Sequence, residues 1–395
     1  MKQEIKERIE LINKGIVPAG YKKTLVGICP IEWETSKLSE LSTFVGGGTP
    51  STKNRSYWEG NIPWISSSDI SDEGIYNIFV KKFINEESIN NSATKLIPED
   101  SILVVTRVGV GKLAINTVKI CTSQDFTNLI NIKINKKFLA FYLKELINKN
   151  LKNTQGTSIK GITTKELGNY EIFSNNILEQ QKIAEILDCA TRQVELQEQL
   201  VDKLKVQKKA LMQKLLTPQP DWQEVKLGDI CEDIYQPQTV PQKEFKNNGY
   251  KVYGANGFIG FYDKYNHKEW QVVLSCRGDC GTINKTEPES WINGNAMVLK
   301  MEGNELIDKN YFYYQCLATS FKDVIDNSGI PQITRTPLLK KNFRFVKNIN
   351  VQKKLANFFI NIDKQIELQQ KLLEQYKLRQ KALMQLLLTG IVRVK

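Results

Sequence analysis

The stretch QKIAEILDCATRQVELQEQLVDKLKVQKKALMQKLLT, residues 181–217, recurs as KKLANFFINIDKQIELQQKLLEQYKLRQKALMQLLLT at residues 353–389. The two copies lie 172 residues apart, and 16 of their 37 positions are identical. A different stretch of sequence precedes each copy. A repeat of this kind marks a duplicated structural unit. A chain of 395 residues is also too long for a single hydrophobic core, so the sequence predicts two related units.

Both copies have the heptad pattern of a coiled coil, with a few polar residues at matching positions. The a and d positions hold Leu187, Ala190, Val194, Gln197, Val201, Leu204, Lys208, Leu211 and Leu215 in the first copy and Phe359, Ile362, Ile366, Gln369, Leu373, Tyr376, Gln380, Leu383 and Leu387 in the second. We expect the copies to form helices about 55 Å long that pair antiparallel about a pseudo-twofold axis. The alternative is that each helix packs separately onto its own domain.

The charge of the chain favours a polyanionic partner. Lys and Arg total 55 against 43 acidic residues, a net charge of +12, which suits nucleic acid but also describes a generally basic surface. The first twenty residues are charged, no stretch reaches the roughly 18 apolar residues of a membrane span, and seven scattered cysteines do not form a disulfide framework. We therefore expect a cytoplasmic protein.

The stretches that precede the repeats read as short strands and loops, each with one helix, near residues 136–150 and 309–326. A short helix is also predicted over residues 1–13, from Ile5, Ile9 and Ile12. The predicted fold class is α+β, with two mixed α/β domains separated by two long antiparallel helices. The predicted segments are an N-terminal helix and lead-in, a first domain, a central helix, a second domain and a C-terminal helix, at residues 1–20, 21–178, 179–217, 218–349 and 350–395.

Three local patterns recur in the same order in the two domains. WETSKL at 33–38 corresponds to WQEVKL at 222–227, VVTRVGVG at 104–111 to LSCRGDCG at 274–281, and GTSIKGIT at 156–163 to SGIPQIT at 328–334. Elsewhere the domains diverge. The first has GGTPSTKNRSYW at 47–58 and IPWIS at 62–66, where the second has YGANGFIGFY at 253–262. A shared framework with different loops is what two binding modules of different specificity require.

With these stretches, the two Arg-x-x-x-Gly segments and the repeated helix ends QKKALMQ (207–213) and RQKALMQ (379–385), the chain resembles the specificity subunits of type I restriction-modification enzymes over nearly its whole length. The resemblance implies two target recognition domains, each reading one half of a split, asymmetric DNA site, on a helical spacer. It further implies partners: two modification subunits that bind S-adenosylmethionine, and restriction subunits that use ATP and Mg²⁺. The chain itself would carry no cofactor and direct adenine methylation or restriction by those partners.

The residues do not assemble a catalytic site. GVGK at 109–112 lacks the other residues of a phosphate loop, and His267 is the only histidine, so no His-based acid-base pair can occur in both units. Cys276 and Cys280 lack the four patterned ligands of a structural zinc site and are interpreted as buried thiols. We therefore expect no catalysis and no bound metal.

Reading duplex DNA requires cations at phosphates and hydrogen-bonding groups at base edges, which loops can provide. The predicted DNA-binding residues are Lys53, Arg55, Arg107, Lys112, Ser158 and Lys160 in the first domain and Lys251, Asn256, Arg277, Gln332 and Arg335 in the second. The helix pair would hold the domains about one DNA turn, roughly 34 Å, apart. Two alternatives remain: the specificity component of a type IIB or related methylation-based defence system, and a coiled-coil adaptor that does not bind DNA.

Overall fold

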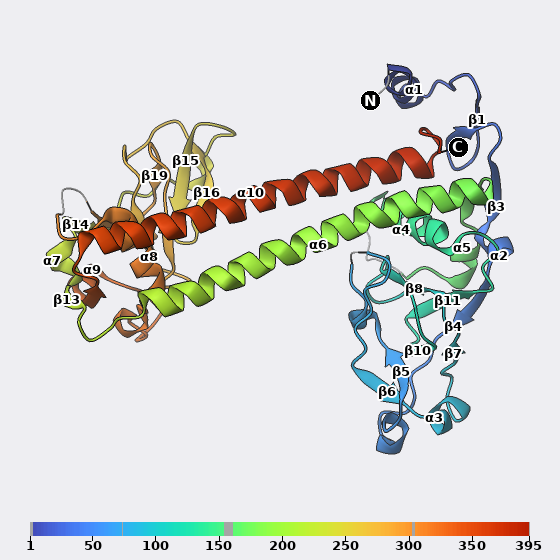
Figure 1. Ribbon diagram of the computed structural model, residues 1–395, viewed down its shortest axis with the longest axis horizontal. Coiled ribbons are helices and arrows are strands. Elements are labelled where there is room, and N and C mark those ends of the chain that lie inside the picture. Colours follow the sequence, from blue (N-terminus) through green and yellow to red (C-terminus); the bar gives the residue numbers. More distant parts are fainter. Residues whose placement is uncertain (1–2, 73, 154–160, 302–304, 395) are drawn as a thin grey trace. The chain divides into compact units, whose positions relative to one another are not determined.

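The computed structural model describes residues 3–72, 74–153, 161–301 and 305–394. It divides into two units, one of residues 1–199 and 371–395 and the other of residues 200–370. Two 40-residue helices, α6 (Ile177–Leu216) and α10 (Ile349–Leu388), each belong to both units (Figure 1). Each unit therefore contains the first half of one helix and the second half of the other.

The first unit is built of short strands and helices around this helical pair. Its helices are α1 (Gln3–Asn13), α2 (Leu38–Leu41), α3 (Glu86–Asn90), α4 (Lys136–Asn153) and α5 (Thr164–Gly168). Its strands are β1 (Tyr21–Lys23), β2 (Ile28–Pro30), β3 (Glu34–Lys37), β4 (Thr43–Gly46), β5 (Ile62–Ile65), β6 (Lys82–Ile84), β7 (Leu96–Ile97), β8 (Ile102–Val105), β9 (Leu113–Ile115), β10 (Ile120–Thr122), β11 (Phe126–Ile130) and β12 (Glu171–Ser174).

The second unit follows the same order with fewer elements. Its helices are α7 (Leu227–Ile230), α8 (Lys309–Ala318) and α9 (Arg335–Leu339). Its strands are β13 (Gln223–Lys226), β14 (Asp233–Tyr235), β15 (Tyr250–Gly254), β16 (Gly257–Tyr262), β17 (Val272–Ser275), β18 (Ile283–Lys285), β19 (Trp291–Ile292), β20 (Ala296–Lys300) and β21 (Asn342–Phe345). Helix α8 is shorter than predicted, because the backbone is extended at Thr319 (ψ 134°).

Besides a two-stranded sheet, β12-β3 in the first unit and β13-β21 in the second, a four-stranded sheet is common to both units. In the first its order is β4-β11-β8-β9 and in the second β14-β20-β17-β18, and every neighbouring pair is antiparallel. The inner strands β8 and β17 are buried along their full length, as their aliphatic residues favour. A further sheet differs: it is β6-β5-β10-β7 in the first unit and β16-β15-β19 in the second. This difference falls where the two sequences diverge.

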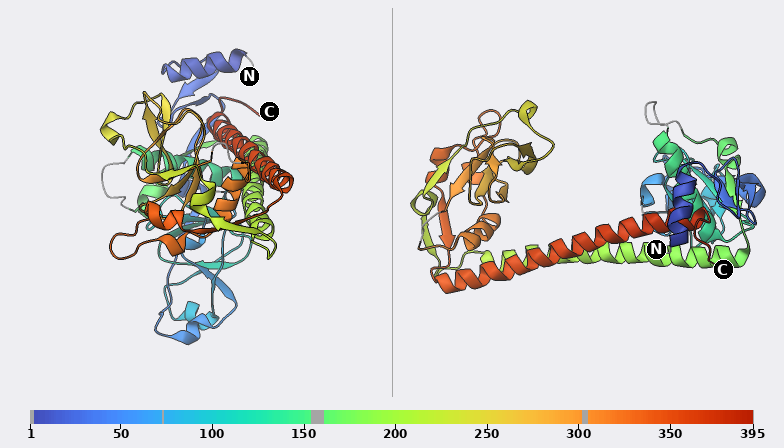
Figure 2. Two further views of the ribbon diagram at one scale, coloured as in Figure 1. Left: turned by 90° about the vertical axis from the view of Figure 1, so that its left-hand side faces the viewer. Right: turned by 90° about the horizontal axis from the view of Figure 1, so that it is seen from above.

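The two helices pair with each other in both units. In the first unit Gln380 Nε2 donates to Thr191 Oγ1 (2.8 Å) and Lys377 Nζ lies 2.6 Å from Glu198, so α6 and α10 run antiparallel there (Figure 2). In the second unit Lys208 on α6 forms an ion pair with Asp363 on α10. The prediction that the copies pair with each other is confirmed within each unit, and the separate packing of each helix is wrong.

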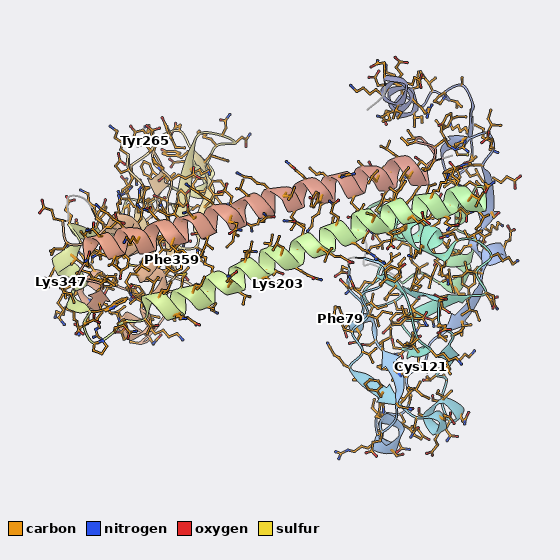
Figure 3. The ribbon with its side chains drawn as sticks, viewed as in Figure 1. Phe79, Cys121, Lys203, Tyr265, Lys347 and Phe359 are labelled. Atoms are coloured by element: carbon orange, nitrogen blue, oxygen red, sulfur yellow. The ribbon has the colours of Figure 1, made fainter. Side chains whose placement is uncertain are left out.

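Each core is completed by the end of a helix that began in the other unit. Leu387 and Leu388 of α10 are buried with Leu187 of α6 in the first core. Leu216 of α6 is buried with Phe359 of α10 in the second core, and Figure 3 labels Phe359 among the side chains of that unit. The helices are thus part of both hydrophobic cores as well as a connection between them.

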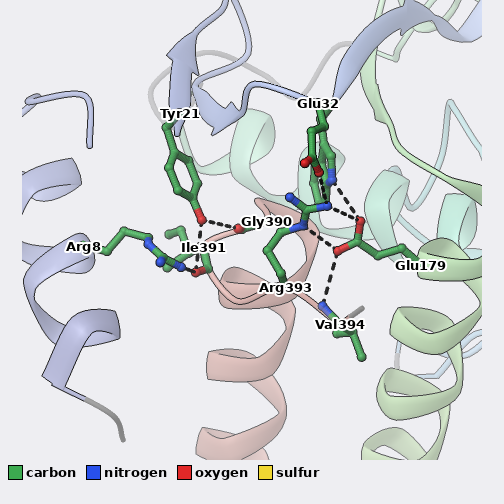
Figure 4. Close-up of polar contacts among 9 residues, drawn as sticks. Arg8, Tyr21, Glu32, Glu179, Gly390, Ile391, Arg393 and Val394 are labelled. Carbon is green, nitrogen blue, oxygen red and sulfur yellow. Dashed lines mark hydrogen bonds and ion pairs between the residues drawn. The ribbon is translucent and has the colours of Figure 1, made fainter. Parts of the chain in front are cut away.

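The segment that follows α10 is bound into the first unit (Figure 4). Arg393 Nε donates to Glu179 Oε1 (2.7 Å) and its NH2 group to Glu179 Oε2 (3.0 Å), while Trp33 Nε1 also donates to Glu179 (3.1 Å). Tyr21 donates its hydroxyl to Gly390 O (2.8 Å). Burial alone would raise the pKa of Glu179, but the hydrogen bonds from Arg393 and Trp33 outweigh it and hold that pKa below its usual value.

Candidate nucleic-acid interface

An exposed arginine opens the same loop in both units. Arg107 follows β8 and Arg277 follows β17, and both side chains are exposed. The glycine four residues on has a positive φ, 103° at Gly111 and 89° at Gly281, and its N–H donates back to Val105 O (3.3 Å) or Ser275 O (2.9 Å). Because that conformation costs a residue with a side chain about 1–2 kcal/mol, the Arg-x-x-x-Gly spacing has a physical cause.

A later segment of each unit closes on this arginine loop. Ile162 N–H donates to Thr106 O (2.7 Å), and Ile333 N–H donates to Cys276 O (3.0 Å) in the second unit. The correspondence predicted between GTSIKGIT and SGIPQIT is therefore confirmed at these two isoleucines. The predicted residues Ser158 and Lys160 belong to this segment but lie outside the described residues.

In the first unit the arginine loop borders a cavity of about 740 Å³. Its lining includes Arg107, Gln124 and three glycines, Gly46, Gly47 and Gly161. A Cβ at Gly47 would stand 2.0 Å from Ser123 O, and one at Gly161 would stand 2.7 Å from Thr106 O, so close backbone contacts demand glycine at both places. Sequence reasoning missed Gln124, because a single glutamine between strands carries no motif.

A second basic group in the first unit surrounds two tryptophans. Lys82 Nζ lies 5.5 Å from the ring centroid of Trp58 and 5.6 Å from that of Trp64. Arg55, which was predicted, and Lys81 and Lys82, which were not, line one shallow cavity there. Lys53 is exposed in the loop that leads into it. The tryptophans pack edge to face at 5.1 Å, and Trp58 lines the same cavity.

In the second unit three predicted residues gather on the Arg277 loop. The backbone of Arg277 forms an antiparallel bridge with that of Gln332. Asn256, in the turn between β15 and β16, donates its amide to Asp279 Oδ2 (3.0 Å) in the same loop. A polar surface therefore joins elements that are more than seventy residues apart in sequence.

Three other predicted residues have their charges engaged within their own unit. Lys112 Nζ lies 3.3 Å from Ile70 O and 3.5 Å from Asp72. Lys251 forms an ion pair with Glu287, and this hydrogen bond raises the pKa of the lysine. Arg335 donates to Ile234 O (2.6 Å) and lies 2.9 Å from Asp233, which ties α9 to β14. These contacts give each side chain a structural role.

The groups considered for chemistry are packed as structural residues. His267 is buried, with Nε2 2.9 Å from the Tyr235 hydroxyl and Nδ1 2.6 Å from Asn266 Oδ1. All seven cysteines are free; Cys276 is buried, which raises its pKa, but Cys280 is only partly buried. Within the described ranges, no three His, Cys, Asp or Glu side chains form a group that could hold a metal ion. The helices in those ranges also include none long and apolar enough to cross a membrane.

The fold and the two loop clusters define a class: a protein with two recognition domains of one framework, each presenting an arginine beside loops of its own. The chain matches the family described as "Type I restriction modification DNA specificity domain" over residues 30–206 and 219–378. It therefore belongs to that family.

Two named relatives agree with this assignment, and a solved structure shares the fold. The chain is 26% identical over 411 residues to the type I restriction enzyme MjaVIII specificity subunit of Methanocaldococcus jannaschii, covering 93% of this chain and 94% of that one. It is 33% identical over 174 residues to the MjaIX specificity subunit of that organism, 42% of this chain and 40% of the relative. The S subunit of a type I restriction-modification system from M. genitalium has a similar fold, with a TM-score of 0.61, 18% identity, and coverage of 90% and 96% of the two chains.

Proposed function

We propose that this chain is the DNA-reading subunit of a type I restriction-modification complex, in which each unit reads one half of a split, asymmetric target. One observation carries the proposal. The two units share a four-stranded sheet and its arginine loop, but differ in the second sheet and its loops. Two identical readers would serve a symmetric site, whereas different loops on one framework suit two different half-sites.

Charge and geometry support a nucleic-acid partner. The chain has a net charge of +12, which strengthens binding to phosphates at low salt. Arg107 and Arg277 are exposed beside polar loops and can donate two hydrogen bonds to a guanine edge. The adaptor alternative gives the paired arginine loops no purpose, and the family that the chain belongs to is described by DNA specificity.

Repeated apolar residues on the helices suit two copies of one partner. Leu196 and Leu368 occupy equivalent positions in the repeat and are 66% and 64% exposed; Val206 and Leu378 are equivalent and 69% and 67% exposed. Each unit thus presents one residue of each pair to solvent. Single exposed apolar residues are common on protein surfaces, but their recurrence at equivalent positions suits a partner bound in two equivalent copies, and we assign these residues to two modification subunits.

The proposal leaves chemistry to the partner chains. Modification subunits would bind S-adenosylmethionine and methylate adenine, and restriction subunits would use ATP and Mg²⁺. A protein that works on cellular DNA acts in the cytoplasm, and the seven free cysteines fit that reducing compartment.

A domain exchange tests the division of labour. Residues 21–178 would be replaced by the corresponding segment of another specificity subunit, and methylated sites would be mapped by single-molecule sequencing in cells that supply the modification subunit. We expect one half of the methylated sequence to change and the other to stay the same. A change in both halves would refute separate reading.

A binding measurement tests contact with DNA itself. The assembled complex would be titrated with a duplex that contains the mapped site, in rising salt, beside a duplex with the site scrambled. Affinity should fall steeply with salt for both duplexes and be higher for the intact site at every concentration. Equal affinity for both duplexes would refute sequence-specific reading, and an absence of binding would favour the adaptor.

A further inference from the structure

At the rim of the arginine loop, a glutamine in one unit is equivalent to a glycine in the other, at two positions. The N–H of Thr106 donates to Asp125 O (2.8 Å), and in the second unit the N–H of Cys276 donates to Asn295 O (3.1 Å). The residues before these acceptors, Gln124 and Gly294, are therefore equivalent.

The reverse exchange occurs on the neighbouring strand. Val45 pairs with Asn128 and Tyr235 with Val298, so the residues that follow, Gly46 and Gln236, are equivalent. Each unit thus has one exposed glutamine at this rim, supplied by the segment before β11 in the first unit and by the segment after β14 in the second.

Both glutamines lie beside the residues that hold the arginine loop. Gln124 lines the same cavity as Arg107. Gln236 Nε2 lies 3.0 Å from the sulfur of Cys276, the residue immediately before Arg277. In the second unit a side chain could not be supplied from Gly294, since a Cβ there would be 2.7 Å from Pro237 O. Because Gly294 has no room for a side chain, the glutamine of the second unit comes instead from Gln236, after the neighbouring strand β14.

The two amides present opposite hydrogen-bonding groups. Thr49 donates its hydroxyl to Gln124 Oε1 (2.5 Å), and in this arrangement the NH₂ group of Gln124 is left as a donor. Gln236 donates its NH₂ group to Cys276 Sγ (3.0 Å) and Gly294 O (3.1 Å), which leaves its carbonyl oxygen as an acceptor. Because purine N7 and carbonyl oxygens accept while the amino groups of adenine and cytosine donate, the two amides suit different base edges.

We propose that Gln124 and Gln236 determine sequence specificity, each at one base pair of its own half-site. Gln124 donates to a base-edge acceptor, and Gln236 accepts from an exocyclic amino group of adenine or cytosine. The inference rests on the proposed function and refines it by adding, to each unit, one reader that the arginine motif did not reveal.

The test maps methylated sequences made by the complex with Gln124→Ala or Gln236→Ala. Each change should relax one position of one half-site, with a loss of discrimination of roughly two- to twelvefold, the value of one hydrogen bond. The other half-site should stay unchanged, so each variant controls the other. Gln238→Ala is the matched control, because Gln238 is exposed two residues from Gln236 and it is its backbone oxygen that accepts a hydrogen bond from Trp291 Nε1 (3.1 Å).

Two further variants keep the result decisive. Gln124→Glu replaces the donor with an acceptor and should disfavour the original base more strongly than alanine does, which an unfolded variant would not do. Arg107→Ala separates the two hypotheses. If Arg107→Ala alters the first half-site while the Gln124 variants leave the methylated sequence unchanged, or lower methylation equally at all sequences, the inference fails and the proposed function stands. If none of these variants changes sequence preference or DNA affinity, the proposed function fails as well.

Discussion

Replacing Arg393 with methionine should destabilise the first unit by about 2–4 kcal/mol. Its partner Glu179 is 6% exposed and receives two hydrogen bonds from the guanidinium, at 2.7 and 3.0 Å. A lost charged hydrogen bond costs about 1.5–3 kcal/mol, and a broken buried ion pair about 3–5 kcal/mol. Because the Arg393 side chain is 21% exposed and thus reaches water, we expect a loss below the upper limit for a fully buried ion pair, about 2–4 kcal/mol.

Hydrogen exchange of the intact chain measures this effect region by region. We expect faster exchange in Arg393→Met around α4 and the first half of α6, with α8 and β20 unchanged, since the latter lie in the second unit. Arg192→Met is the control: that arginine is 65% exposed and 3.5 Å from Asp188, which keeps its closer ion pair with Lys137 (2.9 Å), so the loss should be about 0–1 kcal/mol. Equal protection in Arg393→Met and wild type would refute the reasoning.

The same ion pair makes stability depend on pH. The pKa of Glu179 is lowered from 4.5 in the folded chain, so the stabilisation is complete above pH 4.5 and is lost as pH falls through the lower folded value. Without Arg393, burial raises this pKa, and the carboxyl group is already neutral at a higher pH. The difference between wild type and Arg393→Met should therefore narrow below pH 4.5. A difference that widens on acidification would contradict this assignment.

Three further changes test other parts of the structure. Lys208→Met should lower the midpoint of thermal unfolding, and adding Asp363→Asn to that variant should lower the midpoint little further, because the two side chains form one ion pair. Additive losses in the double variant would exclude their coupling. Gly281→Ala should cost about 1–2 kcal/mol in urea unfolding, since φ is +89° there, and an unchanged midpoint would exclude a rigid turn. Leu196→Ser with Leu368→Ser should weaken binding of the modification subunit at least tenfold by calorimetry while DNA affinity of the isolated chain stays constant; unchanged binding would move the docking surface elsewhere.

The sequence predicted the helices and the repeated framework well, because both depend on periodic or duplicated patterns. Heptad residues such as Leu187 and Phe359 are buried as their register requires, and the Arg-x-x-x-Gly spacing marked both loops. Antiparallel pairing of the two copies also explains why each unit contains the first half of one long helix and the second half of the other.

Individual site residues were harder to predict, because a charge in a loop does not reveal its partner. Lys112 and Arg335 were predicted together with Arg107, yet their charged groups contact Asp72 and Asp233. Gln124 became visible only when the backbone hydrogen bonds of Thr106 and Cys276 showed that it is equivalent to Gly294 of the second unit. Such residues are defined by tertiary contacts, which a single sequence does not encode locally.

Because α6 and α10 each contribute to both hydrophobic cores, they set the order in which the two units can fold during synthesis. The second core is complete once the ribosome has made residue 370, whereas the first still lacks Leu387 and Leu388 at that moment. Although it is translated first, the first unit must therefore finish folding last. Until then its apolar surface is open to chaperones and proteases, so a message cut short within α10 would yield a product prone to degradation.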